Sequence, residues 1–239
     1  MSELHWDAPE KPAELAENRL VSAILDGTFP IDSNLPPERE LAARLGVTRP
    51  TLREVLQRLS RDGWLEIHHG RATRVRNFLE EGNLNLLAAV ARHPEHLPPN
   101  FIPDLLFVRV LMAPAYTRLA MERSLTEVIR LLESLQHLPD TPAAYAEHDF
   151  RLHSRLAVLS GNPIFNLILN SFGDLYYDMA LLYFELPDAR HHSRSYYKKM
   201  MDAVLSNDHF TAEEVTRQVM RDSLEIWRKT ALSLSSRED

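Results

Sequence analysis

Two side chains in the second half of the sequence have types and spacing that suit chemistry. Asp149 and His153 form an Asp-x-x-x-His motif. On a helix this spacing places a carboxylate and an imidazole on one face, which is enough to begin a divalent-metal site. The alternative, which we favour, is an ordinary polar pair inside a helical bundle. A metal-dependent hydrolase would need more ligands and a general base, and neither is evident, so we expect no enzyme.

The absence of cysteine narrows the chemistry further. With no cysteine in 239 residues, disulfide scaffolds, thiol nucleophiles, zinc fingers and iron–sulfur clusters are excluded. Only seven glycines are present, which leaves little from which to build a glycine-rich phosphate loop. Binding functions therefore remain more plausible than catalytic ones.

Arginines are concentrated in one short stretch of an acidic protein. The chain carries a net charge of −7, yet residues 36–76 hold nine arginines against five acidic residues. A local excess of positive charge suggests one surface that faces a polyanion such as DNA. The alternative is a solvated arginine face without a partner.

The elements expected around this basic stretch are three helices and a hairpin. Apolar residues recur at helical spacing from Ala13 to about residue 25, a short helix is expected over 36–45, and a third helix runs from its expected cap, Thr48, to about residue 62. Beyond Gly63 the pattern changes to period two over 64–67 and 73–76, which predicts two short strands. Residues 1–76 thus read as a winged helix-turn-helix, a DNA-binding module.

The second helix of such a motif reads base edges with its N-terminal residues, and the wing reaches the backbone or the minor groove. Arginine pairs with guanine, and threonine bonds phosphates or bases. The predicted contacts on the helix are Thr48, Arg49, Thr51 and Arg53. Those on the wing are His69, Gly70, Arg71 and Thr73. A small structural winged domain is the alternative.

The rest of the chain is expected to be helical. Residues 77–84 are interpreted as a linker, and residues 85–239 as an all-α domain for effector binding and dimerisation. Its helices are predicted over about 84–92, 101–121, 124–136, 140–160, 163–184, 188–207 and 211–233. No apolar run approaches the ~18 residues of a membrane span, and the N-terminus lacks a secretory pattern, so we expect no membrane partner and a cytoplasmic location.

The first half carries a family resemblance. The segments 35–42 (LPPERELA) and 46–59 (GVTRPTLREVLQRL) resemble the DNA-binding domain of GntR-family bacterial regulators, and the helical second half is similar to the FadR subgroup. The resemblance implies a homodimer on palindromic double-stranded operator DNA and adds Arg39 to the contacts. Pro50 and Arg71 depart from the subgroup's pattern, which implies a different operator sequence.

The subgroup also implies an effector. The FadR-like regulators that this chain resembles control fatty-acid metabolism and respond to a long-chain acyl-CoA. The resemblance implies that Arg109, Ser223 and Trp227 hold that ligand. Tyr176 and Tyr183 lie two turns apart on one helical face and are added as candidates. We expect no cofactor. The alternative is a regulator that senses a small carboxylate through zinc or nickel bound to Asp149 and His153. Other regulators of the wider subgroup add further histidines to such a metal site, and those histidines are missing here.

Overall fold

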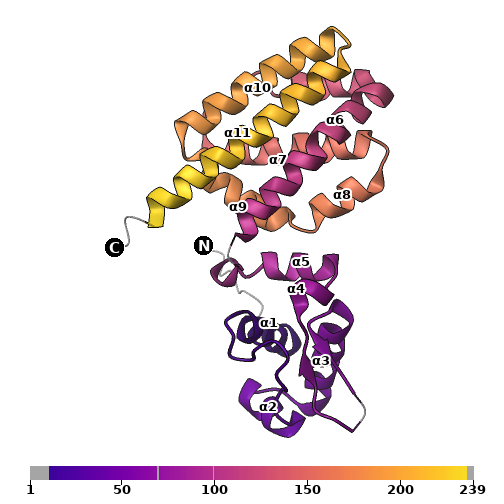
Figure 1. The fold of residues 1–239 in the computed structure, drawn as a ribbon, viewed down its shortest axis with the longest axis vertical. Helices are drawn as coiled ribbons and strands as arrows, with labels where there is room; N and C mark the ends of the chain where they lie inside the picture. Colours follow the sequence, from indigo (N-terminus) through magenta and orange to yellow (C-terminus); the bar gives the residue numbers. More distant parts are fainter. Residues whose placement is uncertain (1–10, 69, 99, 236–239) are drawn as a thin grey trace, which may run out of the picture. The chain divides into compact units, whose positions relative to one another are not determined.

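The computed structural model describes residues 11–68, 70–98 and 100–235, with the backbone alone for residues 174 and 230–235. The chain divides into two compact units, residues 1–98 and 99–239 (Figure 1). The described residues hold helices and one small two-stranded sheet, as the sequence predicted. No helix in the described part of the chain is long and apolar enough to cross a membrane.

Three helices form the body of the first unit: α1 (Pro12–Leu25), α2 (Glu38–Leu45) and α3 (Arg49–Asp62). The predicted caps are present. The Thr48 hydroxyl accepts the Thr51 backbone N–H at 3.3 Å at the start of α3. Gly46, with φ 73°, ends α2 in the left-handed region, where glycine avoids a steric penalty. These two residues fix the tight turn between α2 and α3, and thereby the helix-turn-helix.

The wing is a hairpin shorter than its period-two pattern. Strands β1 (Leu65–Glu66) and β2 (Arg74–Val75) pair antiparallel, with Leu65 opposite Val75. The loop before α2 extends this pairing: the Leu35 N–H donates to the Thr73 carbonyl, and the Val75 N–H donates to the Ser33 carbonyl, both at 2.8 Å. The sequence did not suggest this pairing, which ties the wing to the chain ahead of α2.

Residues 77–84, interpreted as a linker, belong to the first unit, although Phe78 is the one buried residue among them. They contain α4 (Phe78–Glu81), and α5 (Leu84–Ala91) begins at their end, followed by the 3-10 turn η1 (Pro94–His96). Phe78 is buried with its ring 4.9 Å from that of Trp64. This ring contact ties the segment to the first unit, and the border between the two units falls at Pro98.

The second unit is a helical bundle. Its helices are α6 (Phe101–Glu133), α7 (Pro142–Leu159), α8 (Pro163–Asn170), α9 (Gly173–Phe184), α10 (Pro187–Leu205) and α11 (His209–Ser235). The break predicted near Ser124 is a kink within α6, where that residue has φ −147° and ψ 44°. The single helix predicted over 163–184 is two helices, because the backbone leaves helical geometry at Phe172, with φ −133° and ψ 23°.

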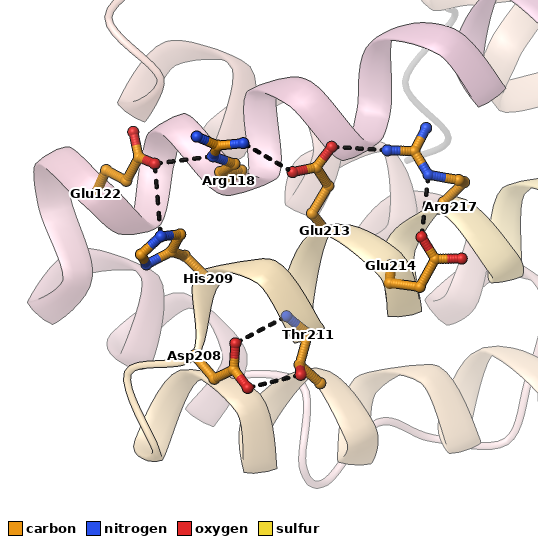
Figure 2. Close-up of polar contacts among 8 residues, drawn as sticks. All are labelled: Arg118, Glu122, Asp208, His209, Thr211, Glu213, Glu214 and Arg217. Atoms are coloured by element: carbon orange, nitrogen blue, oxygen red, sulfur yellow. Dashed lines mark hydrogen bonds and ion pairs between the residues drawn. The ribbon is translucent and has the colours of Figure 1, made fainter.

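Polar contacts join the start of α11 to the middle of α6 (Figure 2). Arg118 on α6 donates to Glu122 on its own helix at 2.8 Å and to Glu213 on α11 at 3.4 Å. Glu213 also accepts from Arg217 at 2.7 Å. The carboxylate of Asp208 accepts the Thr211 N–H at 2.9 Å near the beginning of α11. Charge and hydrogen bonds therefore fix the N-terminal part of α11 against α6.

Candidate functional site

A surface groove in the first unit lies between α3 and the wing. It brings together residues that the sequence placed on the two halves of a DNA-reading surface: Arg53 on α3, and Gly70, Arg71 and Thr73 on the wing. Gly70 has φ 73°, which favours glycine at the tip of the hairpin. His69, the remaining wing candidate, lies outside the described residues. The groove therefore joins helix and wing on one face.

The N-terminus of α3 presents the other predicted contacts. Thr48, Arg49 and Arg53 are exposed, and Thr51 is half-buried. The Thr48 and Thr51 hydroxyls lie 2.8 Å apart, so each holds the other in place. The hydroxyls and the exposed arginines at this end of the helix can reach phosphates and base edges.

The arginines of the basic stretch divide into two groups. Some stabilise the fold: Arg58 pairs with Glu17 of α1 at 2.9 Å, and Arg74 pairs with Glu66 across the hairpin at 2.8 Å. Within the part of the chain that the structure describes, Arg39 and Arg71 make no ion pair, and both are exposed. The sequence count of nine arginines therefore overstates the charge that is free to meet a polyanion.

Arg49 and Arg53 form an intermediate case. Both are exposed, and both share one carboxylate, that of Glu38 at the start of α2. The Arg53 Nε donates to Glu38 Oε2 at 2.8 Å, and Arg49 Nη2 lies 4.0 Å from the same oxygen. Sequence reasoning missed Glu38, because the sequence alone gives an acidic residue at the start of a helix no partner on the next one.

The second unit encloses a small cavity among α6, α7, α9, α10 and α11. All five residues predicted to hold an effector line it: Arg109, Tyr176, Tyr183, Ser223 and Trp227. Most of the remaining lining is apolar, including Leu105 and Met220. The free space is about 60 Å³, which is room for a few water molecules.

A buried ion pair closes the polar side of this cavity. Arg109 Nη2 lies 3.4 Å from Asp149 Oδ2, and both residues are buried. The Tyr176 hydroxyl donates to the same carboxylate, and the Arg109 guanidinium lies 4.6 Å from the centre of the Tyr176 ring. Burial raises the pKa of Tyr176 well above its usual value, so the hydroxyl keeps its proton and remains a donor.

His153 extends this network as a neutral group. Its side chain is fully buried, and burial lowers its pKa to about 4. The Tyr116 hydroxyl lies 2.8 Å from its Nδ1, and its Nε2 lies 3.7 Å from Asp149 Oδ1. Burial raises the pKa of Tyr116, so the hydroxyl is protonated and can donate to Nδ1. The Nε2 then carries the ring proton and faces the carboxylate.

The structure joins the residues of the two rival effector hypotheses. Arg109 was predicted to bind an acyl-CoA, and Asp149 was a candidate metal ligand. In the structure the two side chains form an ion pair with each other. The ring of Tyr196 stacks on His153 with centroids 6.4 Å apart. No group of three or more acidic or histidine side chains that could hold a metal is found among the described residues.

The remaining effector candidates lie on α9 and α11. The Tyr183 hydroxyl donates to Ser223 Oγ at 3.3 Å, and burial raises the pKa of Tyr183 to about 12. Trp227 follows one turn later on α11 and is half-buried. The tyrosines that sequence reasoning missed, Tyr116 and Tyr196, carried no signal in the sequence, because a tyrosine at helical spacing fits any bundle core.

Comparison with known proteins agrees with this architecture. Residues 12–75 match the family described as bacterial regulatory proteins, gntR family, and residues 76–238 match the FadR C-terminal domain. The fatty acid metabolism regulator protein of Klebsiella pneumoniae is 40% identical over 94% of both chains, and that of Shewanella denitrificans is 41% identical over 91% of both. The solved structure of Lar from Listeria monocytogenes, 14% identical, has the same fold, with a TM-score of 0.59 over 93% of this chain and 99% of that one.

The winged module and the helical bundle thus define a transcription regulator that is not an enzyme. The chain belongs to the gntR family of bacterial regulatory proteins and, within it, to the group that carries the FadR C-terminal domain and includes the fatty acid metabolism regulator proteins.

Proposed function

We propose that this regulator controls genes of fatty-acid metabolism and that a long-chain acyl-CoA, bound in the cavity of the second unit, modulates its binding to operator DNA. The single observation that carries the proposal is the cavity itself: an apolar lining closed on one side by the buried Arg109–Asp149 pair. Apolar walls suit an acyl chain, since each buried methylene contributes about 0.8 kcal/mol. The cation and the Ser223 hydroxyl suit the polar end of the ligand.

Such a ligand cannot enter without moving helices. The free space of about 60 Å³ is far smaller than a long acyl chain, so α9 and α11 would have to shift away from α6. The start of α11 is fixed to α6 by Glu213, and its later turns line the cavity, which favours movement of the later turns (Figure 2). A ligand that binds only the opened bundle favours that conformation, and this difference in affinity is what can change operator binding.

We further propose that the protein acts in the cytoplasm as a homodimer. A two-fold pair places two α3 helices in successive major grooves, so the operator is a palindromic duplex. Sedimentation of the full chain with and without a selected operator tests this proposal. A single protomer bound to one half-site would refute it.

The effector is tested by fluorescence. Trp227 lines the cavity, so its emission should change on titration with palmitoyl-CoA, with CoA alone as the matched ligand control. The change should disappear in Trp227→Phe, while thermal stabilisation by palmitoyl-CoA persists. No stabilisation by any acyl-CoA of eight to eighteen carbons would refute the acyl-CoA proposal.

The alternative effector is separated by elemental analysis. Zinc or nickel bound stoichiometrically to the purified full chain, and lost in Asp149→Asn, would favour the regulator that senses a small carboxylate through a metal. Under the acyl-CoA proposal, Arg109 rather than a metal neutralises this carboxylate.

A further inference from the structure

We infer that Glu38 is a specificity-determining residue: its carboxylate restrains Arg49 and Arg53 so that they serve base readout rather than unselective phosphate binding. The inference rests on the proposed DNA-binding role of this groove. Glu38 lines the groove together with Arg53, Arg71 and Thr73, so its negative charge lies on the face that meets the duplex. A carboxylate at this place repels phosphate, and its presence there needs a reason.

The geometry supplies that reason. Arg49 and Arg53 lie one turn apart on α3, and both guanidinium groups approach the same oxygen, at 4.0 Å and 2.8 Å. The Arg53 Nε donates to Glu38, so the two terminal guanidinium nitrogens of Arg53 are not used in this hydrogen bond. Those terminal nitrogens are sufficient for a bidentate pair with guanine. The carboxylate thus holds Arg53 at Nε and leaves the terminal nitrogens of that side chain available, whereas it faces Arg49 only at longer range, 4.0 Å from Nη2.

The restraint acts differently on operator and non-operator DNA. On non-operator DNA, affinity comes almost entirely from cations that move to phosphates, and a paired arginine is less able to do so. On the operator, a restrained arginine that already points at its guanine loses less side-chain entropy on binding. Glu38 should therefore weaken non-operator binding more than operator binding.

The neighbouring acid on the same helix provides a matched control. Glu40 is also exposed near the start of α2, but it pairs with Arg44 on its own helix and does not line the groove. Glu38→Gln and Glu40→Gln remove the same charge from the same helix. A general effect of net charge or of the helix dipole would appear in both variants, whereas a restraint on the reading arginines appears only in the first.

The test measures binding of the full-length protein to two duplexes. The wild-type protein first selects an operator from a pool of random duplexes; a scrambled duplex of equal length and composition is the competitor. Glu38→Gln should bind the scrambled duplex about three- to tenfold more tightly, with a salt slope steeper by up to about one unit. Its preference for the operator should fall by up to the same factor, while Glu40→Gln keeps the wild-type preference.

Each outcome decides a separate point. If the wild-type protein selects no sequence and binds no duplex, the proposed function fails, and Glu38 has no role to explain. If the wild-type protein discriminates and Glu38→Gln discriminates equally well, the inference about Glu38 is wrong. If both variants gain equally on both duplexes, net charge alone explains the result, and the restraint is refuted. Unchanged circular dichroism and melting temperature show that the fold is intact.

Discussion

Protonation of His153 should destabilise the second unit in a defined pH range. The folded protein holds this imidazole with a pKa of about 4, lowered by burial, while the unfolded chain binds the proton near 6.5. Between these values the unfolded state binds more protons, so the free energy of unfolding falls as the pH falls. Above about 6.5 neither state is protonated and the contribution vanishes.

The size of the effect follows from the shift. A difference of about 2.5 pKa units corresponds to roughly 3 kcal/mol, fully developed only below pH 4. This is a large part of the stability of a typical domain, which is about 5–15 kcal/mol. Solvent does not screen this charge, because the side chain of His153 has no exposed surface, so the whole pKa difference acts on the free energy of unfolding.

The variant His153→Phe isolates this contribution. It removes the titrating group but leaves the Tyr116 hydroxyl without its partner, so at pH 7 we expect a loss of about 1–3 kcal/mol. As the pH falls to 4.5 this deficit should shrink and can reverse, since in the wild type the unfolded chain then gains a proton on this ring that the folded state does not bind. The difference in free energy of unfolding is measured by urea titration followed by circular dichroism at each pH.

A matched substitution guards against a general effect of losing a histidine. His191 on α10 is exposed, and His191→Gln removes an imidazole without touching the buried network. This variant shows what the loss of an exposed histidine alone does to the stability at each pH. A difference between His153→Phe and the wild type that does not change from pH 7.5 to 4.5 would show that His153 does not titrate as a buried neutral group.

Three further substitutions test the interface and the fold. Arg49→Ala should cost about 1–3 kcal/mol on the selected operator and relax its base preference, measured by competition binding. Arg71→Ala should weaken all duplexes alike and reduce the salt slope by about one unit, measured by titration at several salt concentrations. Gly63→Ala places a Cβ 3.0 Å from the Gly82 Cα at a φ of +101°, so it should lower the melting temperature more than Gly27→Ala, where φ is also positive but the space is open.

The parts of the fold that the sequence predicted are the parts governed by local rules. Thr48 caps α3 and Gly46 ends α2, and both residues act on backbone groups within a few positions of themselves. The turn between the two helices follows from these caps. The hairpin followed in the same way from a change of period at Gly63. Local chemistry therefore sufficed for the helix-turn-helix and its wing.

Long-range contacts account for what the sequence could not predict. Arg109 and Asp149 are forty positions apart in the chain, and no periodicity connects them. Each was assigned to a different hypothesis, although in the structure they are one ion pair. Phe78 likewise sits in a segment read as a linker, and only its contact with Trp64 shows why that segment is helical. The periodicity of apolar residues indicates which face of a helix is buried. It does not indicate which other helix packs against that face.

Charge is the feature for which the sequence was most misleading and the structure most informative. The excess of arginine in the first unit suggested broad attraction to a polyanion, but acidic partners neutralise much of it, as Glu17 does for Arg58. Because unselective affinity grows with the number of free cations, neutralising them lowers binding to every duplex. Among the residues that the structure describes, a small set remains: Arg39 and Arg71 make no ion pair, and Arg53 and, at longer range, Arg49 face Glu38. Pairing of arginines therefore lowers unselective affinity, and under the role inferred for Glu38 it raises the share of binding that depends on base contacts.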